Sequence, residues 1–452
     1  MQNNAITDSD KLAAIILVTL RNHIAAKGEL EMPGAVHFID DYLRVIQQWL
    51  GVLGQQPPPQ DIATWRQKLL SQLETLSAAG QHVIVRFTFE PHEHAKGLQG
   101  KFRLKISLQH VAEPELSAHS FEHLAVAKGE LSLPALPAFC VEYAELLERL
   151  LVALDRSPPA AKLQALRRRL AAELSAAFDR AAESRLLIRY QTAHPDLEPD
   201  GFILEFDQES RSLQSTYKAW LEERTEPLFG RYPDAKVMAV AAEQPDLAQT
   251  PILDIGAGTG RNSLALARAG NHVDALELMP AFAELLSKDA KAAGLPVDVI
   301  QGNILDDGLL LQPNRYRLII ASEVIPHFRD RRQLHQLLLK ASKMLQANGL
   351  ILFNLFLTVD GYEPDVRVLE FAQNLWSYPL TRAQLHGALD GLPYELLSDE
   401  SVHDYEQSHL PPEAWPPTPW FPSWATGRNL FPIKQTPPLE LRWLVCRKFG
   451  PF

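Results

Sequence analysis

The chain has 452 residues, 46% of them hydrophobic and 22% charged, which is the composition of an ordinary folded protein with roughly two to four domains. A formal net charge of −11 argues against a nucleic-acid-binding surface, so no nucleic acid partner is expected. Only two cysteines are present, Cys140 and Cys446, which excludes a disulfide framework and indicates a reducing compartment, the cytoplasm.

The first predicted element is a helix that contains the apolar run Ala13–Leu20. This run is too short to span a membrane, and Asp8 and Asp10 precede it where a signal peptide would carry basic residues. We therefore expect neither a leader nor a membrane partner.

The first half of the chain contains the same pattern twice. Residues 27–38 (KGELEMPGAVHF) and 128–139 (KGELSLPALPAF) are identical at six of twelve positions, and the offset of 101 residues persists from Tyr42 and Tyr143 to Leu73 and Leu174. Each copy has the pattern of a short strand, two amphipathic helices separated by a proline break, and a strand pair. The sequence predicts a tandem duplicated α+β unit, residues 1–110 and 111–209, packed about a pseudo-twofold axis.

Two features of this half could carry a site. Glu90, His92, Glu93 and His94 form a dense run of potential metal ligands, but the second copy has only His194 at a comparable place. We interpret the run as a solvated turn and predict no metal. The repeated Lys-Gly-Glu-Leu suits a strand held by local packing better than a ligand site.

From about residue 210 strands and helices alternate, which indicates a parallel sheet with helices on both faces. Two helices, Ser212–Arg224 and Asp234–Glu243, are expected before the first strand. Their aromatic and basic residues could cover a cofactor, although surface packing explains them equally well: Tyr217, Trp220, Arg231 and Tyr232.

The stretch 251–261, Pro-Ile-Leu-Asp-Ile-Gly-Ala-Gly-Thr-Gly-Arg, has the pattern of a buried strand, a glycine turn and a helix. Glycines allow the backbone to turn sharply and to approach a ligand closely, at the carboxyl end of a strand where α/β proteins bind cofactors. A dinucleotide fingerprint would need its third glycine at position 261, which is Arg261. With Asp254 ahead of the turn, the spacing resembles motif I, D-x-G-x-G-x-G, of the class I S-adenosylmethionine (SAM)-dependent methyltransferases.

This resemblance covers residues 210–452 and implies a seven-stranded Rossmann-like domain, class α/β, with SAM as cofactor. The motif residues that it implies as cofactor contacts are Asp254, Gly256, Ala257, Gly258 and Gly260.

The next two strands supply further candidates. The second strand ends at Glu277, whose carboxylate can accept hydrogen bonds from both hydroxyls of a ribose. The third is followed by Asn303, where the family commonly has an acid that accepts from the adenine amino group, and an amide oxygen can accept the same bond. The resemblance adds Leu278, Ile304 and Ser322 to the cofactor contacts.

The fourth strand, Tyr316–Ala321, opens into residues 322–328, where the resemblance places the reaction centre. His327 is the candidate general base and Glu323 the candidate for positioning the acceptor, while an ordinary loop histidine remains an alternative. The Asn-Pro-Pro-Tyr or Asp-Pro-Pro-Tyr and Pro-Cys motifs of nucleic-acid methylating enzymes are missing.

The remaining elements complete a doubly wound domain. We expect a helix Arg331–Leu345 capped by Asp330 and ended by Gly349. The other predicted elements are a strand at Leu350–Leu357, a helix at Thr381–Leu389 and strands at Tyr394–Val402 and Leu439–Arg447. Between the last two strands lies Leu410–Pro432, rich in proline and in aromatic residues, which we interpret as a lid or wall over the acceptor, with a packing flap or a partner surface as alternatives.

Within the superfamily the chain looks most like the small-molecule branch that includes tellurite-resistance and thiopurine-type enzymes. We therefore expect methyl transfer to a small-molecule acceptor, with the duplicated half as a recognition or docking module, and a homo-oligomer is left open. One alternative is a protein methyltransferase whose repeats recruit the substrate. The other is a SAM-binding sensor or scaffold without turnover.

Overall fold

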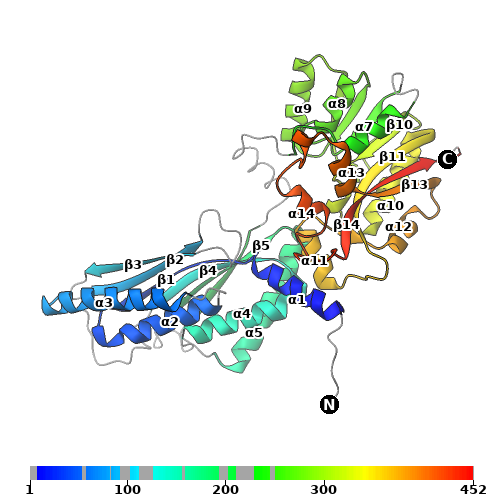
Figure 1. Cartoon of the computed structure of the whole chain (residues 1–452). Coiled ribbons are helices and arrows are strands. Elements are labelled where there is room, and N and C mark those ends of the chain that lie inside the picture. Colours follow the sequence, from blue (N-terminus) through cyan, green and yellow to red (C-terminus); the bar gives the residue numbers. More distant parts are fainter. Residues whose placement is uncertain are drawn as a thin grey trace. The chain divides into compact units, whose positions relative to one another are not determined.

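A computed structural model describes residues 8–52, 57–81, 83–91, 102–110, 126–154, 158–192, 202–209, 229–244 and 250–450. The chain divides into two compact units, Met1–Arg211 and Ser212–Phe452 (Figure 1). Several residues considered above lie outside the described part: His92, Glu93, His94, His194, Tyr217 and Trp220. No helix in the described part is long and apolar enough to cross a membrane.

The front unit repeats one order of elements after an initial helix, α1 (Asp8–Arg21), as the sequence predicts. The first copy consists of β1 (Ala25–Pro33), the 3-10 turn η1 (Val36–Phe38), α2 (Ile39–Val52), α3 (Pro59–Ala78), β2 (Val83–Pro91) and β3 (Phe102–His110). The second consists of β4 (Val126–Pro134), η3 (Pro137–Phe139), α4 (Cys140–Ala153), α5 (Ala160–Arg180), β5 (Arg185–Thr192) and β6 (Phe202–Glu209).

The two copies form one antiparallel sheet of six described strands, in the order β3-β2-β1-β4-β5-β6. The two central strands, β1 and β4, contain the repeated motifs and pair with each other. Gly28 pairs with Gly129, and Lys27 with Glu130. Because each of these two glycines is the other's equivalent under the 101-residue offset, the local twofold axis passes between them. The two Lys-Gly-Glu-Leu segments thus lie side by side where the copies meet, and we call this β1–β4 contact the seam.

The helices α2, α3, α4 and α5 cover one face of this sheet (Figure 1). Alternate strand residues such as Leu131 and Phe87 are buried on that face. Trp49 of the first copy donates from Nε1 to the hydroxyl of Tyr190 of the second, at 3.1 Å, inside the core. The core therefore binds the two copies into one unit.

The opposite face carries alternating charges. Lys27 lies 3.1 Å from Glu130, and Arg189 lies 3.0 Å from the same carboxylate. Arg86 lies 2.7 Å from Glu29. Opposite charges on neighbouring antiparallel strands, directly across or diagonal, favour this pairing and keep the face polar.

The back unit alternates strands and helices. Its elements are α7 (Ala235–Ala242), β7 (Ile252–Ile255), α8 (Arg261–Arg268), β8 (Val273–Glu277), α9 (Pro280–Ala292), β9 (Val297–Gln301), β10 (Tyr316–Ala321), η4 (Ile325–His327), α10 (Arg331–Met344), β11 (Leu345–Thr358), α11 (Val366–Asn374), β12 (Pro379–Leu380), α12 (Arg382–Leu389), β13 (Tyr394–Ser401), α13 (Val402–His409), η5 (Pro412–Ala414), α14 (Phe421–Ala425) and β14 (Leu439–Lys448).

Seven of the described strands follow the order β13-β14-β11-β10-β7-β8-β9, and the short β12 pairs with β11 in addition. The pairs from β11 to β9 are parallel, whereas β14 runs antiparallel to β11 and β13. Strands β7 and β8 are buried at every position, as expected for parallel strands covered on both faces. The order reverses between β7 and β10, and the carboxyl ends of these two strands define the switch point at which such sheets bind ligands.

The end of α10 differs from expectation. The side chain of Asp330 does cap the helix by accepting from the amides of Arg332 and Gln333. The helix stops at Met344, however, and Gly349 lies inside β11 instead of ending the helix. A Cβ at Gly349 would lie 3.0 Å from the Gln346 carbonyl oxygen, so the glycine serves close backbone packing. The short helices α11 and α13 were not expected, because eight or nine residues give too little periodicity to recognise.

The aromatic insertion 410–432 packs on its own unit. Trp424 is 7% exposed, and its ring meets Phe356 of β11 edge-on at 5.3 Å. Its Nε1 donates to the carbonyl of Trp376 at 3.0 Å. At the other end, a Cβ at Gly230 would lie 2.8 Å from the Pro417 carbonyl oxygen. The insertion thus supports both the segment before α7 and the segment before β12.

Candidate functional site

The glycine turn between β7 and α8 has the conformation that the motif requires. Gly256, Gly258 and Gly260 have φ of 71°, 56° and 94°, in the left-handed region that favours glycine. A Cβ at Gly256 would lie 2.5 Å from a methyl of Val324, and one at Gly260 2.3 Å from Leu286. The turn is therefore pressed against the loop after β10 on one side and against α9 on the other.

Glu277 at the end of β8 closes this turn. One carboxylate oxygen accepts from the Gly258 amide at 2.7 Å, and the other accepts from the Met279 amide, also at 2.7 Å. The side chain is buried, which raises the pKa of Glu277, and the amide hydrogen bonds act in the opposite direction. A carboxylate oxygen has more than one acceptor direction, so the group can also accept from a ligand hydroxyl.

The surface beside Glu277 is open. Gly256 and Asn303 are exposed, and Leu278 is 39% exposed although it follows a fully buried strand. Ala257 and Ile304, which follow Gly256 and Asn303 in the sequence, are buried. The Asn303 side-chain oxygen accepts from the Leu305 amide at 2.9 Å, which fixes its orientation. A glycine turn, a buried carboxylate and an exposed leucine are groups that would suit the polar and apolar parts of SAM.

The side chain of Asp254, a predicted cofactor contact, is buried and is bound to the helix after the glycine turn. It is 2% exposed, and its carboxyl group accepts from the Ser263 hydroxyl at 2.6 Å in the first turn of α8. Burial raises the pKa of Asp254 to about 7, against the opposing effect of the Ser263 hydrogen bond. The side chain orients the helix that follows the glycine turn.

Arg261 occupies the position where a dinucleotide fold would have glycine, and it organises a buried network. Its guanidinium lies 2.8 Å from Asp234, the residue that precedes α7. Asp234 also accepts from the Asn262 amide at 2.9 Å and from the Ser322 hydroxyl at 2.8 Å. The hydroxyl of Ser322, a predicted cofactor contact, is thus directed at Asp234. Sequence reasoning missed Asp234 because its partners are 27 to 88 residues away.

Glu323 is the second partner of Arg261. Its carboxylate accepts from the guanidinium at 2.9 Å. Its backbone is left-handed, with φ of 58°, and its amide donates to the Asn354 side chain of β11 at 2.7 Å. Burial raises the pKa of Glu323, while Arg261 lowers it. The residue is held directly after β10, beside the glycine turn that Val324 touches.

His327 ends the 3-10 turn η4 on the same loop. Its ring lies 5.5 Å from the ring of Trp376, and burial lowers its pKa to about 4. Nδ1 is buried and makes no hydrogen bond to any residue that the structure describes. The imidazole is therefore neutral near pH 7, and one of its ring nitrogens keeps a lone pair that can accept a hydrogen bond or a proton.

Comparison with known proteins agrees with this geometry. Residues 252–349 match the family model described as "Methyltransferase domain". The back unit is a class I SAM-dependent methyltransferase domain. The match covers the strands β7 to β10 and the loop that carries Glu323 and His327, and the predicted fold class of this half is confirmed.

Curated relatives share the name "Ubiquinone biosynthesis O-methyltransferase". The one from Azorhizobium caulinodans is 28% identical over 153 residues, 32% of this chain and 58% of the relative. The one from Xylella fastidiosa strain M23 is 35% identical over 85 residues, 19% of this chain and 34% of the relative. The aligned part of the chain therefore spans little more than half of the first relative and about a third of the second.

Two solved structures match part of the chain at low sequence identity and low TM-score. The geranyl diphosphate C-methyltransferase from Streptomyces coelicolor A3(2) is 14% identical, with a TM-score of 0.38, and the match covers 53% of this chain and all of that one. The [4+2]-cyclase SpnF is 15% identical, with a TM-score of 0.35, and the match covers 53% and 96% of the two chains.

The methyltransferase domain has one more buried carboxylate that the sequence did not reveal. Glu406 of α13 is 1% exposed and accepts from the amides of Ala235 at 2.7 Å and Lys236 at 3.2 Å, at the start of α7. Trp443 of β14 donates to it at 3.1 Å. Burial and then Asp234 raise the pKa of Glu406 to about 7. Glu406 anchors α7 and thereby Asp234.

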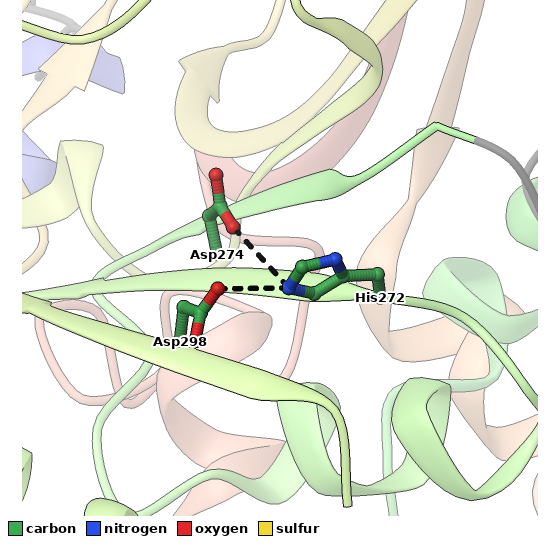
Figure 2. A group of neighbouring side chains, drawn as sticks. All are labelled: His272, Asp274 and Asp298. Atoms are coloured by element: carbon green, nitrogen blue, oxygen red, sulfur yellow. Dashed lines mark hydrogen bonds and ion pairs between the residues drawn. The ribbon is translucent and has the colours of Figure 1, made fainter.

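One further cluster lies at the amino ends of β8 and β9 (Figure 2). Nε2 of His272 lies 2.9 Å from Asp298 and 3.8 Å from Asp274, so the three residues could in principle hold a metal ion. Asp274, however, already accepts from Arg315 at 2.9 Å and from the Tyr316 hydroxyl at 2.8 Å. A guanidinium on the same carboxylate opposes a metal cation, and the cluster lies at the end of the strands away from the glycine turn. The His272–Asp298 hydrogen bond and the Arg315–Asp274 ion pair account for it.

Proposed function

We propose that this protein transfers the methyl group of SAM to a small-molecule acceptor. The observation that carries the proposal is Glu277, a buried carboxylate that binds the Gly258 amide of the glycine turn at the switch point of the sheet. A turn and a ribose acceptor tied together in this way are preorganised for an adenosine cofactor.

One set of side chains would bind the cofactor, and another would bind the acceptor. The glycine turn and Glu277 would hold SAM, with Leu278, Asn303 and Ile304 beside the adenine. Bound SAM supplies an electrophilic methyl group. The loop 322–328 would position the acceptor against it, and His327, neutral at pH 7, would accept a proton where the acceptor carries one.

A small acceptor is favoured over a large one by two observations. The curated relatives are named for ubiquinone biosynthesis, whose methyl acceptors are small molecules. The insertion 410–432 contacts Gly230 on one side and Trp376, the neighbour of His327, on the other. Such an insertion would enclose an acceptor and exclude water from the reaction.

For the duplicated front unit we propose recognition or docking. It has a core of its own, and its open sheet face is charged and polar. This unit is also the reason to retain a protein acceptor as the second candidate, because a separate folded unit beside a catalytic domain can recruit a macromolecule.

The test is a search for labelled products. The purified protein is incubated with SAM that carries an isotopically labelled methyl group and with a dialysed cell extract to which small metabolites are added back. A labelled small molecule supports the proposal, whereas label only in protein favours the second candidate. Tight SAM binding without any labelled product would point to a sensor.

A matched pair of glycine variants controls the assignment of any product to this site. Gly258→Val places a side chain in the glycine turn at a left-handed position, and we expect it to abolish both SAM binding and product. Gly294→Val adds the same side chain at another left-handed glycine, where nothing lies within 4 Å, and should retain both.

A further inference from the structure

The acceptor side of the site has an excess of negative charge. Arg261 is shared between two carboxylates, at 2.8 Å from Asp234 and 2.9 Å from Glu323. Asp234 has further hydrogen bonds from Ser322 and Asn262, whereas the Glu323 carboxylate has only Arg261 among the described residues. One guanidinium cannot neutralise both acids, and no other cationic side chain in the described part of the unit contacts Glu323. Of the two acids, Glu323 therefore has the less compensated charge.

Glu323 also has an oxygen without a partner. Arg261 binds Oε1, and among the described residues none donates to Oε2. The Glu323 side chain is 18% exposed, so this oxygen is accessible to a ligand. A half-buried carboxylate with one free oxygen binds a cationic hydrogen-bond donor more strongly than a neutral one.

His327 provides a second, independent indication on the same loop. Neither of its ring nitrogens makes a hydrogen bond to a described residue, and Nδ1 is completely buried. Buried polar atoms in folded proteins nearly always have partners, so an unpaired imidazole is exceptional. Protein atoms cover Nδ1, so Nε2 is the ring nitrogen that we infer a ligand would meet. The loop thus offers a carboxylate that attracts a cation and a neutral nitrogen that can take a proton.

These two groups match an amine. We propose that the methyl acceptor is an amine, bound as its ammonium form by Glu323 and deprotonated at His327. The inference rests on the proposed function and specifies its substrate class.

The chemistry balances with SAM as the only co-reactant. The ammonium gives one proton to His327, which relays it to water, and the nitrogen regains its lone pair. That lone pair forms the bond to the methyl carbon, and the carbon–sulfur bond breaks toward sulfur. S-adenosylhomocysteine leaves, and the product is the N-methylated ammonium. Glu323 keeps its charge throughout and stabilises both cationic forms of the acceptor.

The first experiment identifies the methylated atom. In the labelled-methyl search, fragmentation of each product by mass spectrometry shows whether the label lies on nitrogen. N-methyl products support the inference. Products labelled only on oxygen, sulfur or carbon overturn it while the proposed function stands, and a wild-type protein that makes no product overturns both.

The second experiment tests Glu323 itself. Glu323→Gln keeps the shape and the Arg261 contact but removes the charge, so we expect the KM for the amine found above to rise about tenfold or more. Glu284→Gln, on an exposed residue of α9, is the matched control and should leave the KM unchanged. An unchanged KM in Glu323→Gln would overturn the role of this carboxylate.

SAM also carries an ammonium group, so the free oxygen of Glu323 could bind either the acceptor or the cofactor. A binding measurement distinguishes these two cases. Calorimetry with S-adenosylhomocysteine, which has this group, is compared with 5′-methylthioadenosine, which lacks it. If Glu323 binds the acceptor, Glu323→Gln leaves both affinities nearly intact. A loss of affinity for S-adenosylhomocysteine alone would assign the oxygen to the cofactor and overturn the acceptor role.

Discussion

Gly28 and Gly129 pair with each other in the register of β1 and β4, and each is the other's counterpart in the sequence repeat. A Cβ at Gly28 would lie 2.6 Å from the Trp49 ring, and one at Gly129 2.3 Å from the Tyr190 hydroxyl. Trp49 and Tyr190 are hydrogen-bonded across the copies. The two glycines therefore make room for the aromatic pair that joins the repeats.

This relationship predicts a stability effect. Gly129→Ala should destabilise the front unit by about 1–3 kcal/mol, because the methyl group overpacks the seam. Gly51→Ala is the control, since nothing lies within 4 Å of that position in α2, and it should be neutral or stabilising by up to ~1 kcal/mol. Scanning calorimetry, which resolves separate transitions, measures both. A front-unit transition that does not move in Gly129→Ala would contradict the tight seam.

For the cofactor site, Glu277→Gln should weaken S-adenosylhomocysteine binding by about tenfold or more. The amide group cannot accept from the Gly258 and Met279 amides at once and also from a ribose, because only one of its two ends is an acceptor. Calorimetry gives the dissociation constant, and Glu284→Gln serves as the exposed control. Equal affinities in the two variants would remove Glu277 from the site.

His327 should affect turnover and leave cofactor binding unchanged. His327→Gln is expected to slow methyl transfer by about 10²-fold and to change the dissociation constant of S-adenosylhomocysteine by less than threefold. Because burial lowers the pKa of His327 to about 4, wild-type turnover should not respond to this group between about pH 5.5 and 8 and should fall as pH approaches 4. Unchanged turnover in the variant would leave His327 as a packing residue against Trp376.

Asp254 predicts a pH dependence of stability. Its pKa is raised from an ordinary acidic value to about 7 by burial, so between about pH 4 and 7 the folded state holds a proton that the unfolded state has lost. The contribution of Asp254 to the free energy of unfolding is therefore complete below about pH 4. It declines as pH rises toward 7, by on the order of 1 kcal/mol per pH unit for one proton.

The variant Asp254→Asn isolates this effect. The asparagine oxygen can still accept from Ser263 but does not ionise. The free energy of unfolding of the variant, minus that of wild type, should therefore increase from pH 4 to pH 7 and level off above pH 7. Urea unfolding of both proteins at several pH values measures this difference. A constant difference would mean that Asp254 is ionised in the folded protein throughout this range.

The two units predict the result of a truncation. A chain that begins near Gln208 should fold and bind S-adenosylhomocysteine, because the proposed cofactor residues all follow residue 250. It should lose acceptor affinity, oligomeric assembly or both, if the front unit recognises or docks. A soluble, monodisperse fragment without cofactor binding would mean that the front unit helps to build the site. Full turnover in the native oligomeric state would refute the docking role.

The parts of the site that follow the chain locally could be predicted from the sequence. The glycine turn depends on left-handed backbone that glycine adopts readily, and Glu277 ends a short apolar strand, so both are visible as spacing. The repeat was visible because the copies retain the residues that pair at the seam. A parallel sheet with helices on both faces followed from the alternation of strands and helices.

The network around Arg261 could only be seen in the folded chain. Asp234, Glu323, Asn354 and Glu406 come from four separate elements, and their hydrogen bonds join residues 27 to 171 positions apart. A polar residue shows no periodicity that would reveal such a partner. Sequence alone determined where the cofactor turn lies and what it resembles. Tertiary structure decided which carboxylates are compensated and which oxygen stays free, because burial and charge compensation depend on neighbours that only the fold brings together.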